Sequence, residues 1–150
     1  MKKSLLTICA VLACVMSFVA CSNNNDDNTP KIAGGWQMVS ANATTEIMPQ
    51  PIPLTDLVKE YVSVIVFNED GTMIPAEAFE KYTLENGVLT INLSKEMAAF
   101  TGMEKLTCNV IELTENTLSI KADNISIEMV PDMPMTVSIT MNFTRVPSNF

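Results

Sequence analysis

The stretch that decides the fold is MTVSITMNFT, at residues 135–144. Hydrophobic and polar residues alternate along it without a break. Successive side chains of a strand point to opposite faces of a sheet, so this pattern predicts a β-strand with one face in a core and the other in water. The hydrophobic set consists of Met135, Val137, Ile139, Met141 and Phe143.

The same alternation recurs upstream, between short turn signals such as Asp70-Gly71 and Asn86-Gly87. Connections this short favour an antiparallel meander, because parallel strands need long crossovers. A meander with one apolar face buries that face by closing on itself. We therefore predict an all-β fold, an antiparallel up-and-down meander closed into an eight-stranded barrel. The predicted strands are residues 35–42, 61–67, 72–75, 81–84, 88–93, 106–113, 117–122, 125–130 and 135–146.

Two segments do not read as strands. Residues 44–54 hold three alternate prolines, which argue against both a helix and a ladder. A helical turn is predicted at residues 55–60 with Thr55 as its N-cap, and a short helix at residues 94–103, capped by Ser94 and stopped at Gly102. We expect both to cover ends of the barrel.

The N-terminus predicts export. Residues 1–20 contain two lysines, an apolar run and a small Ala20, which is the pattern of a signal peptide. The apolar stretch is shorter than the roughly 20 residues that span a bilayer. The sequence FVAC, at residues 18–21, resembles the lipobox of bacterial lipoproteins and implies that Cys21 is lipidated. A cut before Cys14 would leave a very short apolar core.

Three units follow from this cut: a lipoprotein signal peptide at residues 1–20, a polar tether at 21–31 and a barrel domain at 32–150. The tether is rich in Asn and Asp. Composition alone predicts a flexible linker. An acidic, Asn-rich stretch directly after the lipidated Cys also resembles the surface-export signals of Bacteroidetes lipoproteins, and both interpretations stay open.

Composition excludes several classes of function. The formal net charge of −8 argues against nucleic-acid binding, which needs a cationic surface. The chain has no His, which removes His-based catalysis and His-ligated zinc. Cys108 remains alone in the barrel once the leader is cut and Cys21 is acylated, so no disulfide is expected. A cluster of methionines that includes Met133 suits Cu(I) chemically, but we interpret it as core filling. We expect no enzyme activity, no cofactor and no metal.

Two separated elements resemble a known family. Gly34-Gly35-Trp36 matches the Gly-x-Trp motif of lipocalins, and Arg145, the only arginine in the chain, stands where lipocalins place an Arg that packs on that Trp. With the predicted anchor, residues 32–146 resemble the small lipocalin-like lipoproteins of Bacteroidetes. The resemblance implies a lipocalin-like barrel in which Gly34, Trp36 and Arg145 close one end. The chain departs from secreted lipocalins in being shorter and in lacking a helix after the last strand.

Two functions remain. The first is a lipid-anchored cell-envelope protein of the outer membrane, on its inner side or at the cell surface, which binds a small apolar ligand in the barrel with Phe100 and Met103 near the mouth. The second is a structural or interaction module with a filled barrel and an unknown protein partner. The free volume inside the barrel distinguishes them. The predicted ligand-lining residues are Met129, Met135, Val137, Ile139, Met141 and Phe143.

Overall fold

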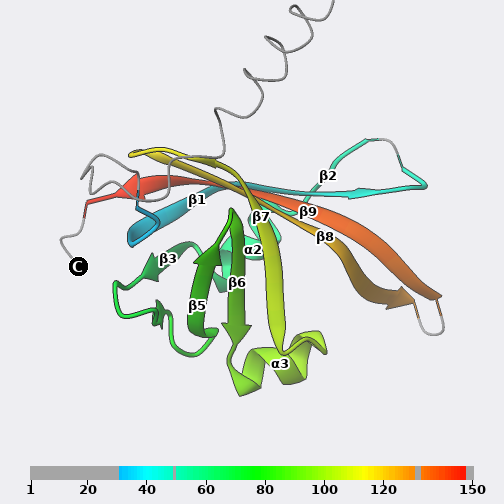
Figure 1. Ribbon diagram of the computed structural model, residues 1–150. Coiled ribbons are helices and arrows are strands. Elements are labelled where there is room, and N and C mark those ends of the chain that lie inside the picture. The colour runs from blue at the N-terminus through cyan, green and yellow to red at the C-terminus, as the bar shows by residue number, and fades with distance from the viewer. Residues whose placement is uncertain (1–30, 49, 131–132, 148–150) are drawn as a thin grey trace, which may run out of the picture.

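The computed structural model describes residues 31–48, 50–130 and 133–147 (Figure 1). These residues form strands joined by short turns and two seven-residue helices, α2 (Thr55–Tyr61) and α3 (Lys95–Thr101). Neither helix, nor any other among the described residues, is long and apolar enough to cross a membrane. The strands are β1 (Gly34–Thr45), β2 (Ile52–Pro53), β3 (Val64–Phe67), β4 (Met73–Ile74), β5 (Phe79–Glu85), β6 (Val88–Leu93), β7 (Lys105–Leu113), β8 (Thr117–Val130) and β9 (Met133–Val146).

The strands make one antiparallel sheet in the order β4-β3-β1-β9-β8-β7-β6-β5, with β2 paired to β1 outside this path. The two ends of the path approach one another. Thr72, next to β4, forms an isolated bridge with Lys81 of β5, and the Tyr82 amide donates to the Gly71 carbonyl over 2.8 Å. The protein is therefore a nearly closed eight-stranded barrel, which confirms the predicted all-β meander. In Figure 1 the long strands β1, β8 and β9 run at a steep angle to β5, β6 and the lower part of β7.

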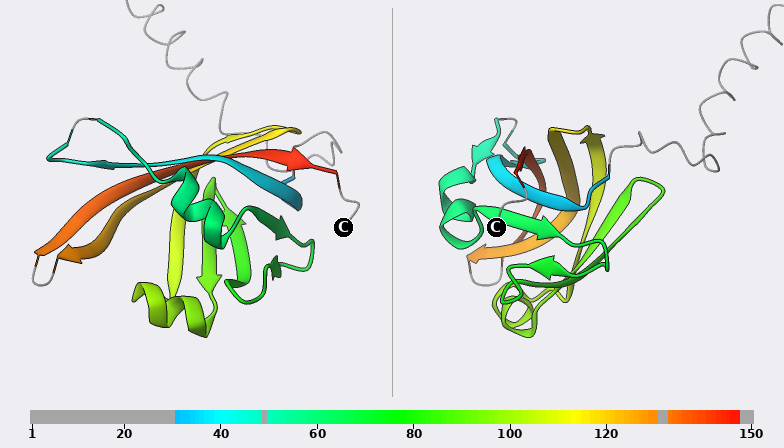
Figure 2. Two further views of the ribbon diagram at one scale, coloured as in Figure 1. Left: turned by 180° about the vertical axis from the view of Figure 1, so that it is seen from behind. Right: turned by 90° about the vertical axis from the view of Figure 1, so that its left-hand side faces the viewer.

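The up-and-down order gives the barrel two distinct ends. At one end, here called the closed end, lie residues 31–33, the β7–β8 turn at residues 114–116 and the end of β9. At the other, here called the mouth end, lie α2 and α3, which connect β1 to β3 and β6 to β7. Figure 2 shows the two helices from behind and from one side. The inward set of the strands packs into a single core, which includes Trp36, Phe67, Leu89 and Ile120.

Strand β8 runs without interruption through residues 123–124, where the sequence predicted a break between two strands. The register against β9 shifts between Ala122 and Ile125, and Asn124 has a positive φ of 57°. The structure thus has a β-bulge at this position, in which one extra residue is accommodated in one strand. The bulge keeps both Ala122 and Ile125 buried, so the apolar face continues.

The proline-rich segment and α2 also differ from the prediction. Strand β1 extends to Thr45, and β2 pairs with it through Asn42–Pro53 and Ala43–Ile52, so the prolines do not exclude a ladder. A proline is tolerated on a short edge strand, where its missing N–H costs no ladder bond. Thr55 does not cap α2, whose N-cap is Leu54 without a side-chain bond. The Thr55 hydroxyl instead accepts from the Ala41 amide over 3.0 Å and joins the helix to β1.

The start of β3 is also later than predicted, because Tyr61 is the last residue of α2 and the strand begins at Val64. Helix α3 is confirmed together with both of its ends. The Ser94 hydroxyl accepts from the Met97 amide over 3.1 Å, and Gly102 ends the helix at a φ of 72°. The same hydroxyl donates to the Glu77 carbonyl and ties α3 to the β4–β5 connection.

Candidate functional site

The closed end is built around one buried aromatic ring. Trp36 of β1 is 0% exposed, and its indole N–H donates to the Ile32 carbonyl over 2.7 Å. The Arg145 guanidinium carbon lies 4.3 Å from the Trp36 ring centroid, within the range of a cation–π contact. Strands β1 and β9 bring the two side chains together because Trp36 and Arg145 are paired in register.

The guanidinium of Arg145 also holds three chain segments in place. It donates to the carbonyls of Lys31 (2.6 Å), Ala33 (2.9 Å) and Glu115 (2.5 Å). A planar fork of donors suits such multiple bonding better than an ammonium would. Arg145 therefore links the start of the barrel, the β7–β8 turn and the last strand over the Trp36 ring.

Gly34 is required by this arrangement. Its φ is 130°, a conformation that other residues rarely adopt, and a Cβ at this position would clash with Nη1 of Arg145. The structure thus places Gly34, Trp36 and Arg145 together at the closed end. Their contacts are structural, because the arginine is engaged by backbone carbonyls.

A cavity of about 310 Å³ lies inside the mouth end. Its volume is at the lower end of the roughly 300–1,000 Å³ typical of small-molecule sites. The lining side chains are hydrophobic, and they come from the barrel strands and from both helices: Met38, Leu57, Val58, Tyr61, Val62, Ile65, Phe79, Ile91, Met97, Phe100, Leu106, Ile120, Met141 and Phe143.

Three of these residues form an exposed rim. Leu57 and Tyr61 of α2 are 56% and 62% exposed, and Phe100 of α3 is 75% exposed. The rings of Tyr61 and Phe100 are 6.2 Å apart, so the two helices meet at the opening. Large apolar side chains in water are costly, and a cluster of them beside a cavity is typical of a binding site.

The predicted ligand-lining residues divide into two groups. Met141 and Phe143 line the cavity. Val137 is buried and Met135 and Ile139 are partly buried against the core, but none of the three lines this cavity.

The reason is the length of the β8–β9 hairpin. Ile139 and Val137 pair with Ala43 and Thr45, near the far end of β1, where the strands project past the lumen (Figure 1). The side chain of Met129 lies outside the described residues. Phe100 is at the opening as expected, whereas Met103 packs on the core and does not line the cavity.

The sequence analysis missed the contribution of α2 to the site. Leu57, Val58, Tyr61 and Val62 all line the cavity. Their i, i+1, i+4, i+5 spacing is the mark of one helix face, and this signal was present in the sequence. The prediction does not use it, because residues 61–67 are assigned there to one strand. The inward residues of β6 and β8, by contrast, carry the period-two pattern that the sequence does display.

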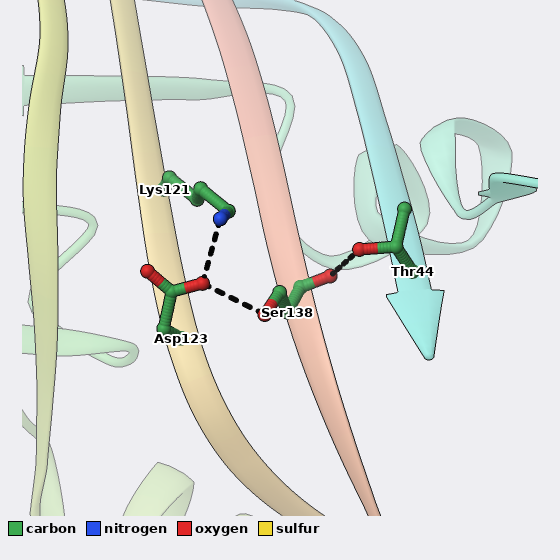
Figure 3. Close-up of polar contacts among 4 residues, drawn as sticks. All are labelled: Thr44, Lys121, Asp123 and Ser138. Carbon is green, nitrogen blue, oxygen red and sulfur yellow. Dashed lines mark hydrogen bonds and ion pairs between the residues drawn. The ribbon is translucent and has the colours of Figure 1, made fainter. Parts of the chain in front are cut away.

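Four polar side chains, here called the polar ladder, are linked by hydrogen bonds and an ion pair on the outer face of β1, β9 and β8 (Figure 3). Lys121 and Asp123 form an ion pair at 2.8 Å, and the Ser138 hydroxyl donates to the same Asp123 oxygen over 2.7 Å. Thr44 donates to the Ser138 carbonyl at 3.5 Å. Hydrogen bonds from Lys121 and Ser138 hold the pKa of Asp123 below its usual value. The ladder joins three strands beside the bulge, and exposed pairs of this kind contribute little stability.

Cys108 does not provide a nucleophile. The side chain is fully buried in β7, and desolvation raises the pKa of its thiol to about 12. The thiolate is the reactive form of cysteine, so this thiol is inert near neutral pH. Within the described residues, no group of three Cys, Asp or Glu side chains is arranged to hold a metal ion.

Comparison with known proteins does not assign the chain to a family. No model of a known protein family matches the chain, and no curated protein is similar to it at a significant level.

Proposed function

We propose that this chain is a lipid-anchored protein of the outer membrane that binds a small apolar molecule in the mouth-end cavity. The observation that carries the proposal is the cavity itself, about 310 Å³ with hydrophobic walls and the rim of Leu57, Tyr61 and Phe100. Burial of apolar surface lowers the free energy by roughly 25 cal/mol per Å², so an apolar ligand would bind without any polar contact. A filled barrel, which the interaction module would require, is not favoured by a cavity of this size.

The second part of the proposal concerns orientation. Residues 1–30 lie outside the described part of the chain, so the anchor rests on the sequence alone. The first described residues, however, are held at the closed end, where Lys31 and Ile32 accept hydrogen bonds from Arg145 and Trp36. A lipid on Cys21 would therefore tether the barrel by its closed end and leave the mouth end free.

The ligand site is tested by filling the cavity. A hydrophobic dye that fluoresces in apolar surroundings is titrated into purified wild-type protein and into Met141→Trp. The larger side chain should weaken dye binding at least tenfold, because it occupies the space the dye needs. The matched control is Ile139→Trp, two residues along the same face of β9 but outside the cavity lining. Equal dye binding by wild type and Met141→Trp would place the dye elsewhere and contradict the proposal.

The anchor is tested separately in cells. Cys21→Ser should abolish incorporation of labelled fatty acid, because it removes the predicted acylation site. The protein should then leave the membrane fraction, because stable anchoring needs more than one acyl chain. Cys14→Ser serves as the control and should still be labelled. The reverse result would place the lipidated cysteine at position 14.

A further inference from the structure

The cavity walls carry no charge and almost no polarity. Of the lining side chains, only Tyr61 has a hydrogen-bonding group beyond a thioether, and Tyr61 is on the exposed rim. Among the described residues, no buried side-chain nitrogen or oxygen lacks a partner. Among the described residues, the inside of the barrel therefore offers no unpaired hydrogen-bond donor that could bind the head group of an anionic ligand.

No lysine or arginine among the described residues lines the cavity. Arg145 is at the closed end and is bonded to backbone carbonyls. The helices at the opening carry two lysines and three carboxylates, all of them exposed. These are Asp56, Lys59 and Glu60 on α2 and Lys95 and Glu96 on α3, and Glu104 and Lys105 next to the start of β7 are also exposed. Solvated charges of both signs offer no buried partner to either a carboxylate or an ammonium group.

An ionised head group would lose its hydration inside such a cavity and gain nothing in exchange. An enclosed acid would have to enter in its neutral form, and each pH unit above its pKa then weakens binding tenfold. An alcohol loses far less on transfer, because it carries no net charge. From this we infer that the cavity selects uncharged apolar molecules and rejects fatty acids and aliphatic amines of the same chain length. The inference rests on the proposed function, of which it specifies the ligand class.

The test compares ligands that differ only in their head group. Decanol, decanoate and decylamine are used to displace the hydrophobic dye from the full-length protein at pH 7.5. Decanol should displace the dye. Decanoate should be weaker by about a thousandfold, because its carboxyl pKa lies roughly three units below this pH. Decylamine should be weaker for the same reason with the opposite charge.

The pH dependence separates head-group ionisation from a simple difference in solubility. Decanoate should gain about tenfold in affinity for each unit by which the pH is lowered from 7.5 to 5.5, whereas the affinity of decanol should stay constant. The charged groups on the elements around the opening are the five on α2 and α3 named above together with Glu104 and Lys105. Decanol measured at each pH controls for any change of the cavity itself.

A charge added to the wall should change the selectivity. Met97 lines the cavity from the first turn of α3 and is partly buried. Met97→Lys should strengthen decanoate binding at pH 7.5 relative to decanol, while Met97→Gln, which is similar in length but neutral, should not. An equal gain in the glutamine variant would contradict the charge argument.

The outcomes distinguish this inference from the function on which it rests. If decanoate displaces the dye from the wild-type protein as well as decanol does, with no dependence on pH, then the cavity accepts anions and the inference is wrong while the ligand site stands. If Met141→Trp excludes the dye but none of the three ligands displaces it from the wild-type protein, then the inferred ligand class is wrong while the ligand site stands. If the dye binds Met141→Trp as tightly as the wild type, then the ligand site itself is wrong.

Discussion

The two ends of the barrel use aromatic residues in opposite ways. At the closed end Trp36 is wholly buried, is hydrogen-bonded to Ile32 and is covered by the guanidinium of Arg145. At the mouth end Phe100 and Tyr61 face water beside an apolar cavity. A buried, fully bonded ring contributes to stability, whereas an exposed ring contributes little and remains available for contact. The difference indicates that the closed end contributes most to stability, and under the proposed function the mouth end is where a ligand binds.

The largest effect is expected at the closed end. Trp36→Ala should lower the free energy of unfolding by about 3–5 kcal/mol, since it removes a large buried side chain and leaves Arg145 without its ring. Urea denaturation measures this change through the shift of the midpoint. Tyr61→Ala is the comparison at the mouth end. Equal losses for the two variants would break the division of roles between the ends.

A smaller but still large loss is expected for Gly34→Ala, at about 2–4 kcal/mol, because the substitution combines a strained φ with a clash against the Arg145 guanidinium. The control is Gly87→Ala in the β5–β6 turn, where φ is also positive but a Cβ would meet nothing within 4 Å. The glycine 87 variant should lose only about 1 kcal/mol from the backbone conformation. Similar losses at both positions would show that the contact with Arg145 does not matter.

At the mouth end, Phe100→Ser should change the free energy of unfolding by no more than about 0.5 kcal/mol, as is usual for exposed positions. The same variant should weaken binding of the hydrophobic dye, because Phe100 lines the opening. Thermal melts and dye titrations on one preparation check both expectations. A strongly destabilised protein with normal dye binding would assign Phe100 to the core instead of the rim.

The smallest effect concerns the polar ladder between the ends. The pKa of Asp123 is lowered in the folded state, so its contribution is present above the unfolded value of 3.8 and is lost as the pH falls through the folded pKa. Asp123→Asn should therefore lose a small amount of stability at neutral pH, of the size expected for one exposed ion pair, and none at pH values below the folded pKa. A loss as large at pH 2 as at pH 7 would contradict this assignment.

Much of the predicted fold follows from local sequence patterns. The alternation of residues 135–144 reappears as the two faces of β9, with Val137 and Phe143 buried and Thr136 and Thr144 exposed. The Asn86-Gly87 turn and the two ends of α3 also follow from residues close together in the chain. These features depend on backbone conformation over a few residues, which is why they were visible without any tertiary information.

The sequence by itself determined the period-two strands, their antiparallel order and the ends of α3. The tertiary structure decided which inward residues face the cavity. Val137 and Met141 belong to the same alternating set, yet only Met141 lines the cavity, because β9 continues past the lumen alongside the far part of β1. It also decided that α2 packs over the opening, with Thr55 bonded to Ala41. Alternation specifies a face, but the position of that face along the barrel depends on pairing between residues about a hundred positions apart, and a local pattern carries no information about that pairing.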